Sequence, residues 1–161
     1  MKFLTGLLLT VCTITNLFAD EALWLRYARI SPDGEKIAFS YKGDIYHVSS
    51  DGGEAVQLTV HEAYDAYPVW NGDGSKIAFA SKRYGNYDIF IMSSEGGTPM
   101  RLTYHSANDR PSDFNNENDA IIFTSSRLDA QSSVLFPSGV LSEAYIVSDT
   151  GGKVSQVITT P

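Results

Sequence analysis

The sequence predicts an all-β fold, and three observations carry this prediction. A unit of about 40 residues occurs three times, because the strings ARISPDGEKIAFS at 28–40, PVWNGDGSKIAFA at 68–80 and PSDFNNENDAIIFT at 111–124 resemble one another. Turn residues separate short β-rich runs in every unit, and no helical period competes with them between the units. Four short strands in about 40 residues are typical of a β-propeller blade, so we expect three four-stranded antiparallel blades of an incomplete propeller.

The first 19 residues are expected to be a signal peptide rather than part of the fold. Lys2 precedes a short apolar run, the run is interrupted by Thr and Asn16, and Ala19 offers a small residue for cleavage. We therefore expect an exported protein, periplasmic or extracellular, with no membrane segment after cleavage. Cys12 leaves with the signal; lipidation of Cys12 is the alternative, which the bulky Val11 before it disfavours.

Composition limits what the remaining chain, residues 20–161, can be. Over all 161 residues, 43% are apolar and 19% are charged, which is too apolar for a disordered protein. The formal net charge of the full sequence, −7, disfavours nucleic acid as a partner. We expect one partial propeller with blades at about 24–60, 64–104 and 108–160.

Each expected blade contains two tight turns at matching positions. Ser31-Pro32-Asp33-Gly34 suits a type I turn, and its last position is Gly34, Gly74 or Asn118 in the three units. Glycine and asparagine are the residues that best tolerate positive φ, so we expect that conformation at all three positions. The second turn is expected at the paired glycines that include Gly53, Gly97 and Gly152.

The strands between these turns alternate large and small residues. In the first unit Ile37 and Phe39 alternate with Ala38 and Ser40, and the second unit repeats this pattern. Such strands have apolar groups on both faces and must be covered on both. We expect the blades to stack with bulky faces against small faces.

The strand order places the two turns of each unit at one end and the loop between the second and third strands at the other. This loop has three residues between Ser40 and Asp44, seven between Ala80 and Asp88, and eighteen between Thr124 and Glu143. Insertions on one face of a repeat protein often mark its binding face. The candidate binding residues there are Arg83, Tyr84, Arg110 and Arg127.

These candidates suit contacts with peptides or protein segments, since arginines grip carboxylates. Arg110 is aligned with Tyr67 of the preceding unit. The alternative is that these are ordinary solvated loop residues. The segment at 134–141, VLFPSGVL, is apolar and is expected to pack against another element.

No credible catalytic, metal or cofactor site is expected in this chain. His61-x-Ala63-x-Asp65 recurs as His105-x-Ala107-x-Asp109, which favours a hydrogen bond within the link between blades over acid–base or metal chemistry. The oxygen-rich string DFNNEND at 113–119 lies on the first turn of its unit, where a simple hairpin explains it better than a calcium loop.

The units resemble the propeller repeat of the periplasmic Tol-system protein and of Tricorn proteases. The strings LWLRYARISPDGEKIAFSYKGDIY, YPVWNGDGSKIAFASKRYGNYDIF, GGTPMRLTYHSAND and LFPSGVLSEAYIV are similar to the beginning of secreted bacterial Tricorn-type serine peptidases. The resemblance implies a larger enzyme with a six-bladed first propeller, a second propeller, a PDZ-like module and a serine peptidase core. It implies that the propellers filter or channel peptides.

The resemblance places none of the family's catalytic positions in this stretch. The partners that it implies are peptides, together with the remaining blades and the catalytic domains of the parent protein. The alternative function is a non-enzymatic extracytoplasmic propeller that binds proteins.

Overall fold

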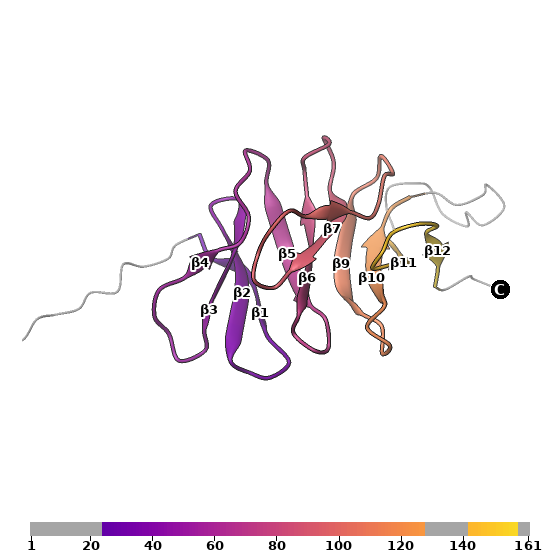
Figure 1. Cartoon of the computed structure of the whole chain (residues 1–161). Coiled ribbons are helices and arrows are strands. Elements are labelled where there is room, and N and C mark those ends of the chain that lie inside the picture. Colours follow the sequence, from indigo (N-terminus) through magenta and orange to yellow (C-terminus); the bar gives the residue numbers. More distant parts are fainter. Residues whose placement is uncertain (1–23, 128–141, 158–161) are drawn as a thin grey trace, which may run out of the picture.

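The computed structural model describes residues 24–127 and 142–157, and these form three four-stranded antiparallel sheets that lie side by side (Figure 1). The predicted all-β, blade-like fold is confirmed. Within the described residues there is no helix with the length and apolarity needed to cross a membrane. The predicted signal peptide and the apolar segment 134–141 lie outside these residues.

Each sheet follows the order of the chain. Blade 1 contains β1 (Arg26–Ile30), β2 (Lys36–Tyr41), β3 (Asp44–Ser49) and β4 (Val56–Gln57). Blade 2 contains β5 (Asp65–Trp70), β6 (Lys76–Ser81), β7 (Asp88–Ser93) and β8 (Met100–Arg101). Blade 3 contains β9 (Asp109–Phe114), β10 (Ala120–Ser125), β11 (Glu143–Ser148) and β12 (Ser155–Gln156).

The first strands of the three sheets, β1, β5 and β9, lie next to one another and are called the inner strands below. The outer strands β4, β8 and β12 are only two residues long. Every inner strand carries a bulge, and in β1 and β5 the bulge places Tyr27 and Tyr67 at φ 57° and 58°. Positive φ is uncommon for tyrosine, so the repeated bulge is a fixed feature of the inner edge.

The turns join the strands at one end of the sheets, called the turn end. Gly34, Gly74 and Asn118 have φ of 79°, 74° and 59°, and each donates its N–H to the carbonyl three residues before it. The predicted positive φ is therefore confirmed in all three blades, including the blade that has asparagine. The second turn repeats the same way, with φ of 116°, 115° and 110° at Gly53, Gly97 and Gly152.

The core lies between the blades, where large residues meet small ones. Ala38 and Ile45 of blade 1 pack with Phe79 and Phe90 of blade 2 in one buried cluster. In the second cluster Ala78, Ile89 and Ile91 of blade 2 pack with residues of blade 3, including Phe123 and Tyr145. The predicted stacking is confirmed.

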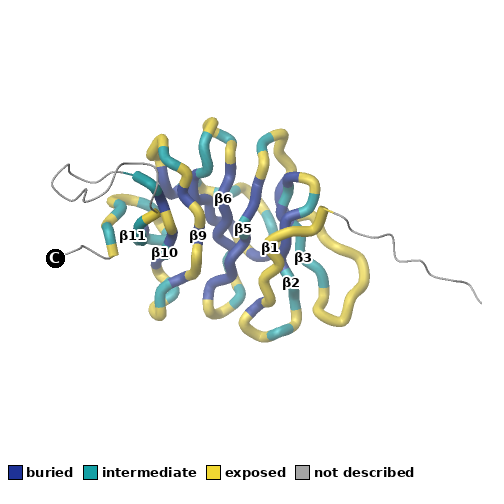
Figure 2. The backbone as a smooth tube through the Cα atoms, turned by 180° about the vertical axis from the view of Figure 1, so that it is seen from behind, coloured by how far each residue is buried: buried dark blue, intermediate teal, exposed yellow. Residues whose placement is uncertain are grey.

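Burial is therefore greatest in the middle blade. Figure 2 shows the buried residues concentrated on β5 and β6, while β1 is exposed along its whole length. Two ion pairs reinforce the stacking at the turn end: Lys36 with Glu95 at 2.8 Å, and Lys76 with Asp149 at 2.5 Å.

Candidate ligand-binding surface of the inner strands

Arg83 and Arg127, two of the predicted binding residues, are held in equivalent ion pairs. The Arg83 guanidinium lies 2.8 Å from the carboxylate of Asp65, and Arg127 pairs in the same way with Asp109. Both carboxylates are fully buried at the start of an inner strand. These arginines therefore attach the loop to the inner strand of their own blade, and most of their charge is already balanced.

Tyr84 lies on the outer side of blade 2. Tyr84 is 62% exposed, and its ring centre lies 4.0 Å from the guanidinium of Arg101 in β8. Arg101 also contacts the ring of Tyr104 at 4.5 Å and pairs with Asp88 at 2.8 Å. Burial raises the pKa of the Asp88 carboxyl, although Arg101 acts in the opposite direction. Tyr84 thus packs away from the inner strands.

Arg110 is the predicted residue that remains exposed on an inner strand. Within the described residues it makes no ion pair, and its guanidinium lies 5.4 Å from the ring centre of Tyr67. The predicted alignment of Arg110 with Tyr67 is wrong. In blade 3, Arg110 pairs with Thr124 of β10, and in blade 2, Ala66 pairs with Ala80 at the equivalent position of β6. The counterpart of Arg110 is therefore Ala66. The two prolines that suggested the alignment, Pro68 and Pro111, occupy different bulge positions.

Arg110 belongs to a row of side chains that crosses all three blades, called the inner tyrosine cluster: Tyr27, Tyr67, Tyr87, Lys82 and Arg110. The Tyr67 ring lies 4.0 Å from that of Tyr27 and 5.9 Å from that of Tyr87. The Lys82 ammonium lies 4.8 Å from the centre of the Tyr87 ring.

Two phenols of this cluster, those of Tyr67 and Tyr87, resist ionisation. A hydrogen bond with Tyr27, together with burial, raises the pKa of Tyr67 to about 12. Burial also raises the pKa of Tyr87. The cluster is therefore positively charged at neutral pH, with neutral rings between the two cations.

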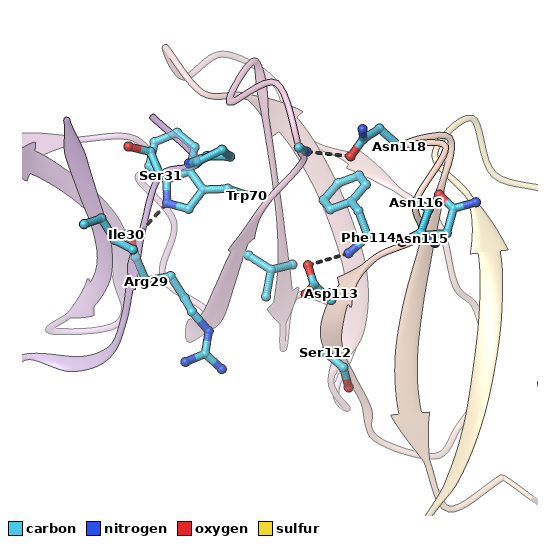
Figure 3. A pocket seen from close by; sticks show the side chains of 13 residues that line it. Arg29, Ile30, Ser31, Trp70, Ser112, Asp113, Phe114, Asn115, Asn116 and Asn118 are labelled. Atoms are coloured by element: carbon cyan, nitrogen blue, oxygen red, sulfur yellow. Dashed lines mark hydrogen bonds between the residues drawn. The ribbon is translucent and has the colours of Figure 1, made fainter. Parts of the chain in front are cut away.

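A groove of about 570 Å³ lies at the turn end of the inner strands (Figure 3). The indole N–H of Trp70 donates to the carbonyl of Arg29 at 3.0 Å and joins β1 to β5. The Gly72 N–H donates to the side-chain oxygen of Asn118 at 2.6 Å and joins blade 2 to blade 3. The groove is lined by Arg29, Ile30, Ser31, Pro32, Val69, Trp70, Gly72, Ser112, Asp113, Phe114, Asn115, Asn116 and Asn118.

Sequence reasoning did not find this groove, because it looked for function in the loops that differ in length. A weak signal was present, since the aligned positions 29, 69 and 113 carry Arg, Val and Asp. The groove combines an apolar wall with one cationic and one anionic side chain, which is the usual make-up of a site for a polar organic ligand.

The histidines of the blade links have the predicted structural role. His61 accepts a hydrogen bond from the N–H of Ala63 at 2.9 Å, and His105 accepts one from Ala107 at 3.0 Å, both through Nδ1. Asn115 closes the hairpin of blade 3, because its side-chain oxygen accepts the N–H groups of Asp119 and Ala120. The described ranges hold no group of three or more residues arranged to bind a metal.

Comparison with protein families assigns the fold to a known group. Residues 22–158 match the family described as the Tricorn protease N-terminal beta propeller domain. The chain belongs to this family. A search of curated protein sequences gave no match.

Solved structures extend the comparison of this Tricorn-type propeller chain. It resembles a TolB-type protein from Agrobacterium tumefaciens, with 26% identity and a TM-score of 0.70 over 86% of this chain and 50% of that one. TolB from Acinetobacter baumannii shows 20% identity and a TM-score of 0.58, over 83% of this chain and 32% of its own. The tricorn protease shows 16% identity and a TM-score of 0.59, over 77% of this chain and 13% of its own. The chain thus spans half or less of each of these proteins.

Proposed function

We propose that this chain is part of the propeller of an exported Tricorn-type serine peptidase and that its inner strands contact peptides and gate their passage. In this proposal the chain takes no part in catalysis, because the resemblance places the peptidase core elsewhere in the parent protein. The family match supports the link to the peptidase. The first 19 residues, which are typical of a signal peptide, support export to the periplasm or beyond.

One observation carries the peptide-binding role: the inner strands of all three blades contribute to a single groove. Arg29 comes from β1, Trp70 from β5 and Asp113 from β9. A peptide offers the matching chemistry, because it carries apolar side chains together with groups of both charges. Because residues of all three blades line the groove, its shape depends on how the blades pack.

Filling the groove tests this role. Ser112 is exposed on β9 and lines the groove, so Ser112→Trp is expected to weaken binding of a fluorescein-labelled random decapeptide pool about tenfold or more, measured by fluorescence anisotropy. Ser155→Trp on the outer strand β12, also at an exposed serine, is the matched control and is expected to bind as the unmodified chain does. Equal binding by both variants, or peptide hydrolysis by the chain alone, would contradict the proposal.

A second candidate is a non-enzymatic extracytoplasmic propeller that binds proteins. It is favoured by the likeness to the TolB-type structure, at 26% identity against 16% for the tricorn protease. The coding sequence of the parent protein separates the two candidates. A peptidase core downstream supports the first candidate, whereas a propeller with no such core supports the second.

A further inference from the structure

We infer that the interface between blades 1 and 2, called the first joint, is an acid-sensitive switch that loosens when His47 of β3 takes up a proton. The inference concerns the packing of the blades and does not depend on the proposed peptide-binding role. Three observations carry it: the place of the His47 side chain, a buried ring nitrogen without a hydrogen-bond partner, and a cation beside the ring.

His47 stands on the side of blade 1 that packs against blade 2. It pairs with Ala38 of β2 and follows Ile45 by two residues on its own strand. Paired residues share a face of the sheet, and so do alternate residues of a strand. Ala38 and Ile45 belong to the cluster that is buried with Phe79 of blade 2. The half-buried His47 side chain therefore points into the first joint.

The other blades have isoleucine at this position. The strand registers place Ile91 of blade 2 and Ile146 of blade 3 as the counterparts of His47. Ile91 is only 5% exposed and packs in the core between blades 2 and 3. Blade 1 thus carries a titratable ring where the repeat otherwise has an apolar side chain, and this makes one joint of the repeat dependent on protonation.

The neutral ring fits the first joint better than the charged ring does. Nδ1 of His47 is buried and has no hydrogen-bond partner among the described residues. An imidazolium carries a proton on both nitrogens, so its Nδ1–H would remain in the joint without an acceptor. The neighbouring Lys36 adds like-charge repulsion. Burial first, and then Lys36, lower the pKa of His47 below 6.5, while Glu95 opposes them.

The acidic groups around His47 do not supply the missing acceptor. The groove of about 460 Å³ beside the ring has four charged side chains, Glu35, Lys36, Asp51 and Glu54. The other neighbouring strand, β4, contains only Val56–Gln57 and has no charge. From blade 2 the charged group that acts on the ring is Glu95, and its carboxylate is held by Lys36 at 2.8 Å.

The sign of the pH effect follows from the lowered pKa. Well above pH 6.5 the ring is neutral in both the closed and the open joint, so the joint keeps its full stability. As the pH falls below 6.5, the ring binds a proton more readily in the open joint than in the closed one, and the open form gains population. Arg29 and Trp70 line the groove at the turn end from opposite sides of this joint, so opening also changes that groove.

Hydrogen exchange followed by mass spectrometry tests the inference on the unmodified chain. After correction for the intrinsic pH dependence of exchange, we expect protection of β2 and β3 to fall about threefold or more between about pH 7.5 and about pH 5.5. Protection of β10 and β11 in blade 3 should stay constant over the same range. No fall in blade 1, or an equal fall in blades 1 and 3, would overturn the assignment to the first joint.

Variants then identify the group that titrates. His47→Ile copies the residue of the other blades and is expected to remove the pH dependence, and the neutral variant His47→Gln is expected to do the same. His105→Gln is the matched control, because His105 is exposed in the link after blade 2 and should leave the pH dependence unchanged. An undiminished pH dependence in both His47 variants would overturn the inference.

Discussion

The turn end and the loop end of the three blades are stabilised in different ways. At the turn end the same backbone hydrogen bonds recur in every blade, as at Gly52, Gly96 and Gly151, which all donate to the serine carbonyl three residues earlier. At the loop end, the opposite end of the sheets, one set of equivalent side chains has different partners in the three blades. The third strand of each blade begins with an acidic residue, and its partner differs: Asp44 accepts from Gln57, Asp88 from Arg101 and Glu143 from Gln156.

This difference shows why the loop end can change without loss of the blade. Backbone bonds within a turn require particular residues at fixed local positions, so the turn end stays similar from unit to unit. At the loop end, pairs of side chains can be replaced one pair at a time, and changes in loop length are tolerated. Exposed cations such as Arg110 can therefore accumulate there without disturbing the core.

The largest effect is expected from breaking a loop-end ion pair. Arg83→Met leaves the fully buried Asp65 carboxylate without its partner, and we expect the free energy of unfolding to fall by about 3 kcal/mol, measured by urea denaturation. Lys153→Met, which removes an exposed charge, should change it by no more than about 0.5 kcal/mol. The double variant Asp65→Leu/Arg83→Met should recover most of the loss. A neutral effect of Arg83→Met would show that the pair does not hold the loop end.

A smaller effect is expected at the turn end, at Asn118. Asn118→Ala places alanine at φ 59° and removes the acceptor of the Gly72 N–H, so it should cost about 1–2 kcal/mol. Asn118→Gly tolerates the conformation and loses only the hydrogen bond, so it should cost less. Urea midpoints of the two variants measure the difference. If glycine costs as much as alanine, backbone conformation does not explain the choice of residue.

The smallest effect is expected in the acid stability of the two ends. Hydrogen bonds from Ser75 and Asn71 lower the pKa of Asp73 at the turn end below 3.8, whereas burial raises the pKa of Asp88 at the loop end. A carboxyl whose pKa is lowered by folding stabilises the fold at pH values above the pKa that it has in the unfolded chain. That contribution is lost as the pH falls through the pKa of the folded state. Asp73→Asn should therefore weaken the fold at pH 7 and flatten its decline below about pH 4, measured by urea midpoints across pH. An unchanged decline would contradict this assignment.

The sequence allowed the turn end to be predicted because its determinants are local. The match of Asn118 to Gly34 and Gly74 was enough to predict positive φ, and the repeated His–Ala spacing was enough to predict the hydrogen bonds in the links. Both features depend on residues that are close in the chain.

The loop end was predicted less well because its partners are distant in the sequence. Arg83 and Arg127 are predicted as candidate binding residues, and in the structure each bonds to an aspartate eighteen residues earlier. The recurrence of this spacing in two units was a signal that could have revealed the pairs. Arg110 was misaligned because the bulge position holds tyrosine in one blade and proline in another. The groove could not be predicted, since its shape depends on how three inner strands pack.

The central claim is that the inner strands of successive blades form one binding surface for peptides. Photo-crosslinking of the unmodified chain with a benzophenone-labelled peptide, followed by mass spectrometry, tests this most directly. We predict crosslinks within Arg26–Ile30, Asp65–Trp70 and Asp109–Phe114. Crosslinks confined to the outer strands Val56–Gln57, Met100–Arg101 and Ser155–Gln156 would contradict the claim.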